Sequence, residues 1–479
     1  MKDPAIQIRL RSLPAVNSLV DQIVAWEAKF GAIGCRDEDR VDICRRSLEA
    51  IRQRILQGEE IDVPVWLEEA RHAIVKELQI RPLHQLNEVI NATGIILHTN
   101  LGRAPIDSQL LHEATRKAGQ YCNLEVDLES GVRSQRQKPI REFLQQLTGC
   151  ESATVVNNCA AATILVLRAL ASSREVIVSR GQLVEIGGSF RIPEIMEVSG
   201  AKLREVGTTN ITRIKDFEKA IQPQTALLMR IHQSNFRIRG FTESPSLEEL
   251  VELGHKHNLP VVDDVGSGVL IPLTPFGMND EPLVPRSIQA GADLVLFSGD
   301  KLLGGPQCGI IIGKKSLIEK LEKDPLMRAL RCDKITLSLL QGTLQKYLQA
   351  KDSWPDILLY RLLAISIEEL RVRSAKFIAE LSSLEEQAEF QLAEETAYVG
   401  GGTLPDQALP TIVIQVSPKS ISSEILCKRL REKFVLARIS EDRVLLDLRT
   451  VLNDQKLAGV LKEALEGICY PDHFAASAR

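Results

Sequence analysis

Lys301 is the residue of this sequence best placed for covalent chemistry, because it follows the apolar run LVLFSGD and precedes Leu-Leu-Gly-Gly-Pro. Glycine and proline specify backbone conformation narrowly at such a turn. An amine held there, just past a buried strand, suits imine formation with a bound aldehyde. Lys301 is therefore a Schiff-base candidate, although an isolated loop lysine is more often simply solvated.

Two adjacent acids, Asp263 and Asp264, lie in the segment PVVDDVGSG. An acid at the end of a central strand can keep a pyridinium nitrogen protonated and so sustain pyridoxal phosphate as an electron sink. Side chains alternate along a strand, so the two acids face opposite sides. We expect Asp264 to face the cofactor and count Ser267, in the following turn, among the cofactor-binding candidates. The alternative is that both carboxylates cap the next segment.

A phosphate site is expected where ATVVNNCAAATI changes from strand to helix, at Asn157 and Asn158. Free amides and the helix dipole favour an anion at a helix start. The hydroxyl of Ser298 could reach the same phosphate, although a turn or capping role is equally consistent with its position. Every α/β protein has several helix starts, so this prediction depends on Lys301 and Asp264.

Other chemistries are disfavoured by spacing. No G-x-G-x-x-G follows a strand, no G-x-x-x-x-G-K-S/T occurs, and the S-x-x-K at Ser298 lacks the S-D-N and K-T-G segments of serine acyl-enzymes. The nine cysteines are scattered without a C-x-x-C pair, which argues against a zinc or disulfide framework. We expect no metal.

Composition places few limits on function. The chain has 479 residues, 44% of them hydrophobic and 25% charged, with a net charge of -4. Such a balance predicts no general attraction to nucleic acid or to membranes, so any contact with a polyanion must come from local patches. The start MKDPAIQIRL is too polar for a secretion signal, and no apolar stretch approaches the roughly 20 residues of a membrane span. A cytoplasmic protein is expected.

The elements that must position these residues fall into three predicted domains. Residues 1–86 have a helical pattern with apolar positions at three- and four-residue spacing. Residues 87–341 alternate short β-branched runs with amphipathic stretches, which predicts an α/β fold with a mostly parallel, helix-covered sheet. Residues 342–479 begin with a long helical pattern and continue as a smaller α/β unit with strands at TIVIQV, VLARIS and RVLLDLR.

Several segments resemble the bacterial L-seryl-tRNA(Sec) selenium transferases, or selenocysteine synthases. They include INATGIILHTNLGRA, VVNNCAAA, VSRGQLVEIGGSFRIPEIM, EVGTTN, VVDDVGSG, SGDKLLGGPQ, PLMRALRCDKITL, GGGTLP and LLDLR. The similarity spans nearly the whole chain. It implies a fold-type-I pyridoxal 5'-phosphate enzyme that converts seryl-tRNA(Sec) to selenocysteinyl-tRNA(Sec), with selenophosphate as the selenium donor.

The resemblance also implies residue roles. The free amine of the esterified serine would displace Lys301 from the cofactor aldehyde, and Lys301 would then remove the α-proton. Loss of the serine hydroxyl leaves an aminoacrylyl group, to which selenium adds. Arg103, Arg328 and Arg331 match family arginines of the donor-anion site, and guanidinium groups suit such an anion. Without the family, Arg328 and Arg331 would be assigned to a solvated helix face and Arg103 to a turn.

Substrate binding and assembly are expected by analogy. The segment beginning RSLPAVNSLV is similar to the family's tRNA-binding domain, and the family forms a homodecamer, a pentamer of dimers. The arginines of the N-terminal region could contact tRNA phosphates, but a salt-bridged helix face is an equal alternative. These are Arg45, Arg46, Arg52 and Arg54.

Two positions depart from the family pattern: Cys159 replaces an asparagine, and Gln182 replaces an acid. The first could alter a hydrogen bond to the cofactor or phosphate, and the second removes a charge near the site. His98 is as consistent with a core position as with catalysis, so it stays outside the catalytic set. Arg133 and Arg136 could touch substrate or a neighbouring subunit.

Two alternative functions remain open on the sequence. The first is a related pyridoxal-phosphate lyase acting on a small, phosphorylated amino acid, for which the N-terminal helical region would have little purpose. The second is a non-catalytic tRNA-binding protein that retains the fold. Visible imine absorbance that depends on Lys301 would exclude the second.

Overall fold

The computed structural model describes residues 4–30, 37–57, 59, 62, 65–66, 74, 86–186, 190–350 and 354–466. Its N-terminal part contains three helices, which confirms a helical N-terminal region: α1 (Pro4–Arg11), α2 (Val16–Phe30) and α3 (Asp37–Leu56). Apolar side chains from α2 and α3 form a small core of their own with Trp66 and Ile74. Among the described residues no helix combines the length and apolarity needed to cross a membrane.

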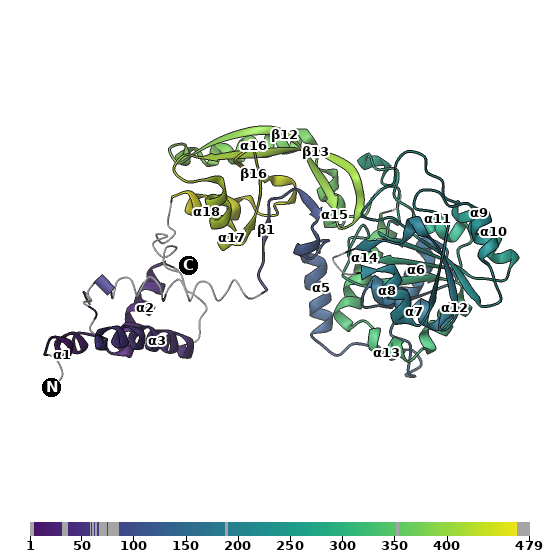
Figure 1. Ribbon diagram of the computed structural model, residues 1–479, viewed down its shortest axis with the longest axis horizontal. Coiled ribbons are helices and arrows are strands. Elements are labelled where there is room, and N and C mark those ends of the chain that lie inside the picture. Colours follow the sequence, from purple (N-terminus) through teal and green to yellow (C-terminus); the bar gives the residue numbers. More distant parts are fainter. Residues whose placement is uncertain are drawn as a thin grey trace.

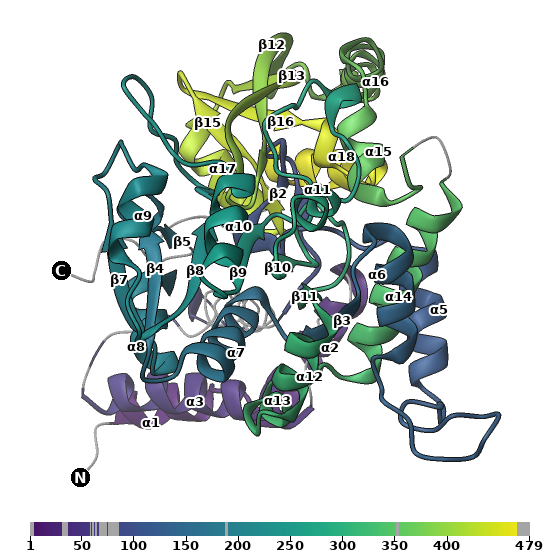
Figure 2. The ribbon, with the colours of Figure 1, turned by 90° about the vertical axis from the view of Figure 1, so that its right-hand side faces the viewer.

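A seven-stranded sheet forms the centre of the larger unit (Figures 1 and 2). Six strands run parallel, and only β11 runs against its neighbours, so the prediction of a mostly parallel sheet is confirmed. The order across the sheet is β3 (Ser152–Val156), β11 (Gly309–Gly313), β10 (Leu294–Ser298), β9 (Val261–Gly266), β8 (Thr225–Ile231), β4 (Glu175–Ser179) and β7 (Lys202–Val206).

Helices cover both faces of this sheet, which is why strands such as β3, β9, β10 and β11 are buried along their whole length. Core contacts on one face come from α7 (Cys159–Ala171), α8 (Ile192–Ser199), α12 (Lys315–Lys323) and α13 (Leu326–Leu330). Those on the other face come from α6 (Lys138–Thr148), α9 (Ile214–Ala220), α10 (Leu247–Lys256), α11 (Val284–Gln289), α14 (Lys334–Gln349) and α15 (Leu358–Ala364). Helix α5 (Ser108–Ala118) packs against α14, and β5 (Glu185–Ile186) pairs with β6 (Phe190–Arg191).

The C-terminal unit is built on a five-stranded sheet, in which the strands after residue 387 are green to yellow in Figure 1 and β2 is the dark blue strand labelled in Figure 2. Its order is β15 (Arg438–Ser440), β16 (Arg443–Asp447), β13 (Thr403–Pro418), β12 (Ala388–Gly400) and β2 (Ile95–Leu97), with helices α16 (Ile367–Glu380), α17 (Ser423–Glu432) and α18 (Asp454–Leu465). The segment VLARIS is split between β15 and β14 (Val435–Leu436), and β14 pairs with β1 (Ile90–Asn91). Strand β12 was not anticipated. The C-terminal unit thus recruits residues 90–97 from far upstream, while the predicted domain boundaries stay predictions.

The helical pattern expected after residue 341 resolves into α14, α15 and α16. Helix α16 starts with Ser366, whose hydroxyl accepts a hydrogen bond from the Glu369 amide at 3.1 Å, while the Glu369 carboxylate accepts one from the Ser366 amide at 2.8 Å. This capping box starts α16 as a separate helix, although the apolar spacing continues from α15 into α16.

Candidate active site

Lys301 lies three residues beyond β10, and only 6% of its surface is exposed. The turn around it is closed by backbone hydrogen bonds from Gly304 to the Lys301 carbonyl at 2.9 Å and from Gly305 to the Gly299 carbonyl at 2.8 Å. Gly304 has φ of +71°, and a Cβ there would lie 2.8 Å from the Ile357 side chain. Only glycine fits this position without strain, so the turn holds Lys301 in one place.

Two buried tyrosines brace the same turn. The Tyr347 hydroxyl donates to the Leu303 carbonyl at 2.9 Å, and the Tyr360 hydroxyl donates to the Leu302 carbonyl at 3.0 Å. The two hydroxyl oxygens are also 2.9 Å apart. Burial raises the pKa of both phenols, so both stay neutral donors. The sequence analysis missed them because they lie on α14 and α15, about 45 to 60 residues downstream.

The adjacent aspartates of β9 face opposite sides of the sheet, as strand alternation predicted. Asp263 is fully buried and accepts two hydrogen bonds from the Arg230 guanidinium, each at 2.7 Å. Asp264 points toward α7, where the Thr163 hydroxyl lies 3.2 Å from Oδ2 and the Cys159 thiol lies 3.9 Å from Oδ1. Asp264 is the acid on the α7 side.

Burial is the main cause of the pKa shifts of Asp264 and Lys301. Burial raises the pKa of Asp264 to about 6, although the Lys301 ammonium and the Thr163 hydrogen bond act in the opposite direction. Burial, followed by the positive charge of Arg103, lowers the pKa of Lys301, against the influence of Asp264 and Asp300. Both shifts favour the neutral forms, because a buried charge is costly. A lysine with a lowered pKa is a better nucleophile and base at neutral pH.

The start of α7 lies beside these groups. The Asn158 side chain caps the helix by accepting from the Ala161 amide at 2.8 Å, and the Asn157 amide donates to the Leu330 carbonyl at 2.9 Å. The amides of Cys159 and Ala160 have no acceptor among the hydrogen bonds of the described residues. They are the donors available for an anion at this helix start.

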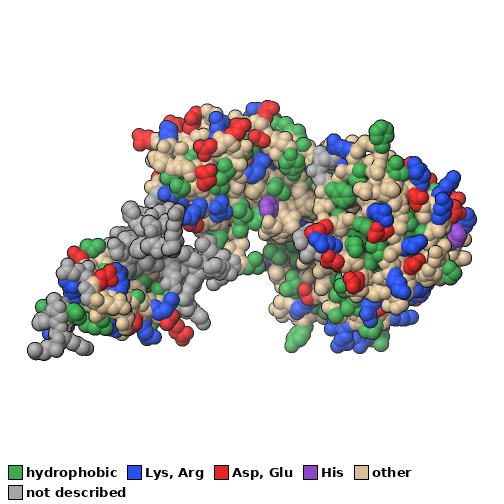
Figure 3. Space-filling view, viewed as in Figure 1, with side chains coloured by type: hydrophobic (Ala, Val, Ile, Leu, Met, Phe, Trp, Pro, Cys, Tyr) green, Lys and Arg blue, Asp and Glu red, His purple; other side chains and the backbone are tan. Residues whose placement is uncertain are grey.

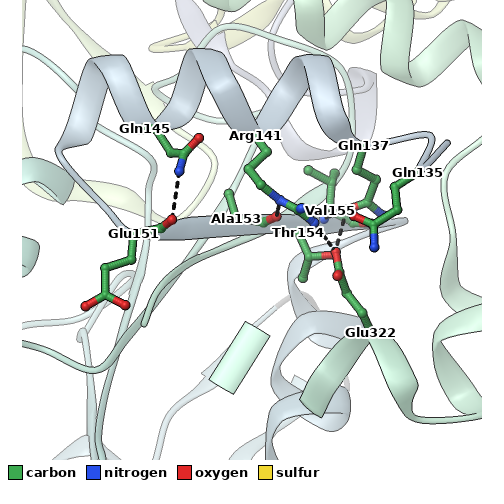
Figure 4. A network of polar contacts seen from close by, with 9 residues as sticks. All are labelled: Gln135, Gln137, Arg141, Gln145, Glu151, Ala153, Thr154, Val155 and Glu322. Carbon is green, nitrogen blue, oxygen red and sulfur yellow. Dashed lines mark hydrogen bonds and ion pairs between the residues drawn. The ribbon is translucent and has the colours of Figure 1, made fainter. Parts of the chain in front are cut away.

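A polar network holds the strand that leads into α7 (Figure 4). Strand β3 is at the edge of the sheet, and the Gln137 amide binds both the Val155 carbonyl at 2.8 Å and the Val155 amide at 2.6 Å. Arg141 donates to the Ala153 carbonyl at 3.0 Å and pairs with Glu322 on α12. The side chains of Gln137, directly before α6, and Arg141, on α6, thus take the place of a neighbouring strand. They satisfy the edge of the sheet and fix the start of α7.

The three arginines expected at the anion site lie in two places. Arg103 pairs with Asp300 at 2.8 Å, directly before Lys301 in the chain. Arg328 and Arg331 are exposed and lie near the start of α7, where Arg331 forms a β-bridge with Val156.

The two arginines of the connector, Arg133 and Arg136, are both tied to Glu125 by ion pairs, and Arg136 also donates to the Cys332 carbonyl at 3.0 Å. Arg331 lies 3.9 Å from the same Glu125 carboxylate. Intramolecular partners therefore account for these connector arginines. Gln182 accepts from the Ile231 amide at 3.1 Å, a bond that an acid at this position could also accept.

Three polar atoms near Lys301 are buried without a hydrogen-bond partner among the described residues: Ser267 Oγ, His232 Nδ1 and Arg103 Nε. Such orphans are rare in native structures and indicate a missing ligand or water. Gly266 has φ of +65°, and a Cβ there would lie 3.8 Å from Lys301 Nζ. An aromatic aldehyde phosphate fits this set, because it would bring an aldehyde to Lys301, a ring nitrogen to Asp264 and a phosphate to α7.

Three residues near this centre were missed by the sequence analysis. Thr163 contacts Asp264, Asp300 pairs with Arg103, and His232 directly follows β8, where its amide donates to the Asp264 carbonyl at 2.9 Å. Burial lowers the pKa of His232 to about 4, which keeps its ring neutral. Asp300 could have been found by its adjacency to Lys301. His232 could have been found only by knowing that β8 and β9 are parallel neighbours.

Fold and site together define a fold-type-I pyridoxal-phosphate enzyme. A buried lysine beyond one strand, an acid on the neighbouring strand and an open helix start converge at the carboxyl ends of a mostly parallel sheet. The chain belongs to the L-seryl-tRNA selenium transferase family, whose model matches residues 89–452.

Individual relatives agree with this assignment. The chain is 46% identical to the L-seryl-tRNA(Sec) selenium transferase of Carboxydothermus hydrogenoformans over 94% of this chain and 96% of the relative. It is 45% identical to that of Aquifex aeolicus over 93% and 96%. A solved D-glucosaminate-6-phosphate ammonia-lyase covers 79% of this chain and 97% of its own at 19% identity and a TM-score of 0.54, which supports the fold alone. Pyridoxal 5'-phosphate is the cofactor of this family.

Proposed function

We propose that this protein converts L-seryl-tRNA(Sec) to L-selenocysteinyl-tRNA(Sec), taking selenium from selenophosphate. The observation that carries the proposal is family membership over nearly the whole chain, joined to a buried Lys301 beside Asp264 and the start of α7. The lyase alternative is not supported, because the lyase resemblance rests on 19% identity and 79% of the chain.

Residues of the chain divide the work of holding the cofactor. Lys301 would hold the aldehyde, and Asp264 would hold a proton on the ring nitrogen. The amides at the start of α7, with Asn157 and Asn158 shaping that start, would hold the phosphate. Ser298 is buried at the end of β10, and Ser267 carries a buried hydroxyl without a partner among the described residues, so both suit a hydrogen bond to the cofactor.

The proposed reaction requires removal of the serine α-proton and binding of the selenophosphate anion. Pyridoxal phosphate, when bound, supplies an electron sink for negative charge at the serine α-carbon. Lys301, whose pKa is lowered by burial, would accept the α-proton. Arg103, oriented by Asp300, would face the reacting end of the substrate, and Arg328 and Arg331 would attract the selenophosphate anion from their exposed positions.

The decisive experiment incubates purified protein with seryl-tRNA(Sec) and selenophosphate and identifies the aminoacyl group by mass spectrometry. Selenocysteine is expected from the natural chain. Lys301→Ala should lose the visible absorbance of the bound cofactor and lower the rate by about 1000-fold or more. Lys320→Ala, an exposed lysine on α12, is the matched control and should keep both. Deamination of a small free amino acid instead, with no selenocysteine formed, would overturn the proposal.

The N-terminal helical region, predicted over residues 1–86, is proposed to bind the body of the tRNA. Its separate hydrophobic core supports an independent role. However, Arg46 pairs with Asp42, Arg52 with Glu49 and Arg54 with Glu59, so three of the four arginines expected to contact tRNA are salt-bridged, whereas Arg45 is exposed. Any phosphate contact by the three salt-bridged arginines would have to displace their acidic partners. Deleting residues 1–80 should abolish tRNA binding and spare cofactor loading.

We further propose a cytoplasmic homodecamer. The segment between α5 and α6 exposes Tyr121, Leu128 and Val132, and large apolar side chains gathered on a surface favour contact with another chain. Light scattering on the eluted protein should give the mass of ten chains. A monomer that is fully active would contradict this assembly.

A further inference from the structure

A cavity of about 740 Å³ lies between residues 86–105, which include β1, and the C-terminal unit. Its walls include His98 and Arg103, at the two ends of the 3-10 helix η1 (Thr99–Leu101), and Arg431, Phe434 and Leu452 from the C-terminal unit. Its volume is within the range of small-molecule sites. The proposed cofactor site is formed by β9, β10 and α7, none of whose residues line this cavity, so the two spaces are distinct and adjoin at Arg103.

At one end of the cavity, the ion pair between Arg103 and Asp300 connects the cavity wall to the segment that carries Lys301. Arg103 lines the cavity and pairs with Asp300 at 2.8 Å, and the Ala104 amide donates to the Asp300 carbonyl at 3.2 Å. Asp300 directly precedes Lys301. Arg103 has φ of +62°, a conformation that non-glycine residues rarely adopt. The backbone is thus held in a strained turn that places the guanidinium between the cavity and the site.

The other wall carries an aromatic ring that is not used in the core. Phe434 is half-buried, yet among the described residues it belongs to none of the hydrophobic core clusters. It also has positive φ, +62°, and its carbonyl accepts from the Ile90 amide at 2.8 Å. Strained backbone of this kind persists where surrounding structure imposes it and is frequent at ligand sites. The backbone of Phe434 is therefore held at the wall of the cavity.

We infer that this cavity seats the 3'-terminal adenosine of the aminoacylated tRNA, with the Phe434 ring stacked on the base. The inference rests on the proposed function and states which part of the tRNA substrate occupies the cavity. The ester joins serine directly to the terminal ribose, so when the serine amine reaches Lys301 the adenosine must occupy a space next to it. Single-stranded RNA ends are recognised by stacking on aromatic rings and by arginine. Phe434, Arg431 and Arg103 supply both.

A small anion alone does not suit the cavity. Selenophosphate would need positive charge, but it has no use for Phe434 or for Leu452, which is 62% exposed on the same wall. A nucleoside uses both kinds of group, because its base is an aromatic plane and its ribose and phosphate are polar. The mixture of apolar and cationic walls therefore favours a nucleotide.

The test measures binding of two RNAs at one fixed salt concentration: seryl-tRNA(Sec), and the same tRNA lacking its terminal adenosine. The proteins are the natural chain, Phe434→Leu, Phe434→Tyr and Phe241→Leu. Phe241 is a surface phenylalanine, 93% exposed and outside the cavity lining, and serves as the matched control. Visible cofactor absorbance checks that each variant is folded and loaded.

Phe434→Leu is expected to weaken binding of seryl-tRNA(Sec) by about tenfold, the effect of losing one base stack, and to leave binding of the shortened tRNA unchanged. Phe434→Tyr should restore binding, and Phe241→Leu should change neither RNA. Equal effects of Phe434→Leu on both RNAs, or none, would overturn the inference. So would a changed elution volume with unchanged RNA binding, which would assign the wall to a subunit contact.

The outcome also separates this inference from the proposed function. If the natural chain forms selenocysteinyl-tRNA(Sec) but shows no preference for the intact 3' end, only the cavity assignment fails. If the natural chain binds neither RNA and forms no selenocysteine, the proposed function fails first.

Discussion

Asp263 and Asp264 are neighbours in β9, yet the two faces of the strand give them different surroundings. Asp263 is fixed by two hydrogen bonds of 2.7 Å from Arg230, so its charge has a permanent partner. Asp264 forms no ion pair among the described residues: it meets the Thr163 hydroxyl at 3.2 Å, the Cys159 thiol at 3.9 Å and the Gly266 backbone amide, and burial raises its pKa to about 6. The comparison teaches that an acid with an incomplete set of partners is the one available to a cationic ligand.

Among the changes that test the two faces of β9, the largest effect is expected from Asp264→Asn, which removes the acid from the α7 face and keeps its shape. We expect the rate of selenocysteine formation to fall by at least about 100-fold, because the amide cannot keep a ring nitrogen protonated. Steady-state assays check this. A rate within a factor of about three of the natural chain would show that the two faces do not differ in function.

The same substitution should change the pH dependence of stability in protein stripped of cofactor. The folded-state pKa of Asp264, about 6, is above its ordinary 3.8, so the folded state binds more protons between these values. The free energy of unfolding therefore falls as pH rises through this window, by on the order of 3 kcal/mol. Asp264→Asn lacks this titration. Its Tm should exceed that of the natural chain at pH 8 and match it at pH 4, and a lower Tm at pH 8 would contradict the argument.

Asp263→Asn tests the other face of the strand. Removing one partner of a buried ion pair leaves Arg230 uncompensated and should destabilise the protein by about 3 kcal/mol, the lower end for such pairs because Arg230 is 25% exposed. The midpoint of urea unfolding measures this. Folded protein should keep its cofactor absorbance, and the double variant Arg230→Gln/Asp263→Asn should recover part of the loss. If Asp263→Asn were stable but inactive, Asp263 rather than Asp264 would be the acid that serves the cofactor.

Thr163→Val sharpens the comparison by removing one partner of Asp264. The valine keeps the volume, and the rate should fall by about fivefold, in line with the loss of roughly 1 kcal/mol. The hydroxyl lowers the pKa of Asp264, so its loss should move the acidic limb of the rate profile to higher pH. Thr148→Val, another buried threonine bonded to a helix carbonyl, is the control and should not move that limb.

The smallest effect concerns the Cys159 thiol. Burial raises the pKa of Cys159, followed by the charge of Asp264, so little thiolate exists at neutral pH. Iodoacetamide should therefore modify the exposed Cys122 well before Cys159, as peptide mass mapping would show. Cys159→Ala should change the rate by less than about threefold. Rapid modification of Cys159 would mean that this thiol is activated.

Part of the fold and of the site could be predicted because it depends on local pattern. The strand that carries Asp263 and Asp264 was evident from its apolar run, and their opposite faces follow from alternation. Lys301 was evident from the turn that contains Gly304. Strand β12 was missed because AEFQLAEETAYVG carries several charges and is only partly buried, so it has no clear strand period.

The amino-acid sequence by itself determined the family, singled out Lys301 as the candidate reactive lysine and indicated most of the strands and helices, because these depend on spacing within short segments. The tertiary structure decided the partners: Arg103 with Asp300, Tyr360 with the turn after Lys301, and Phe434 with the cavity wall. Burial and charge act through space. Residues 197 positions apart, such as Arg103 and Asp300, meet only after the chain has folded, so no local pattern could have paired them.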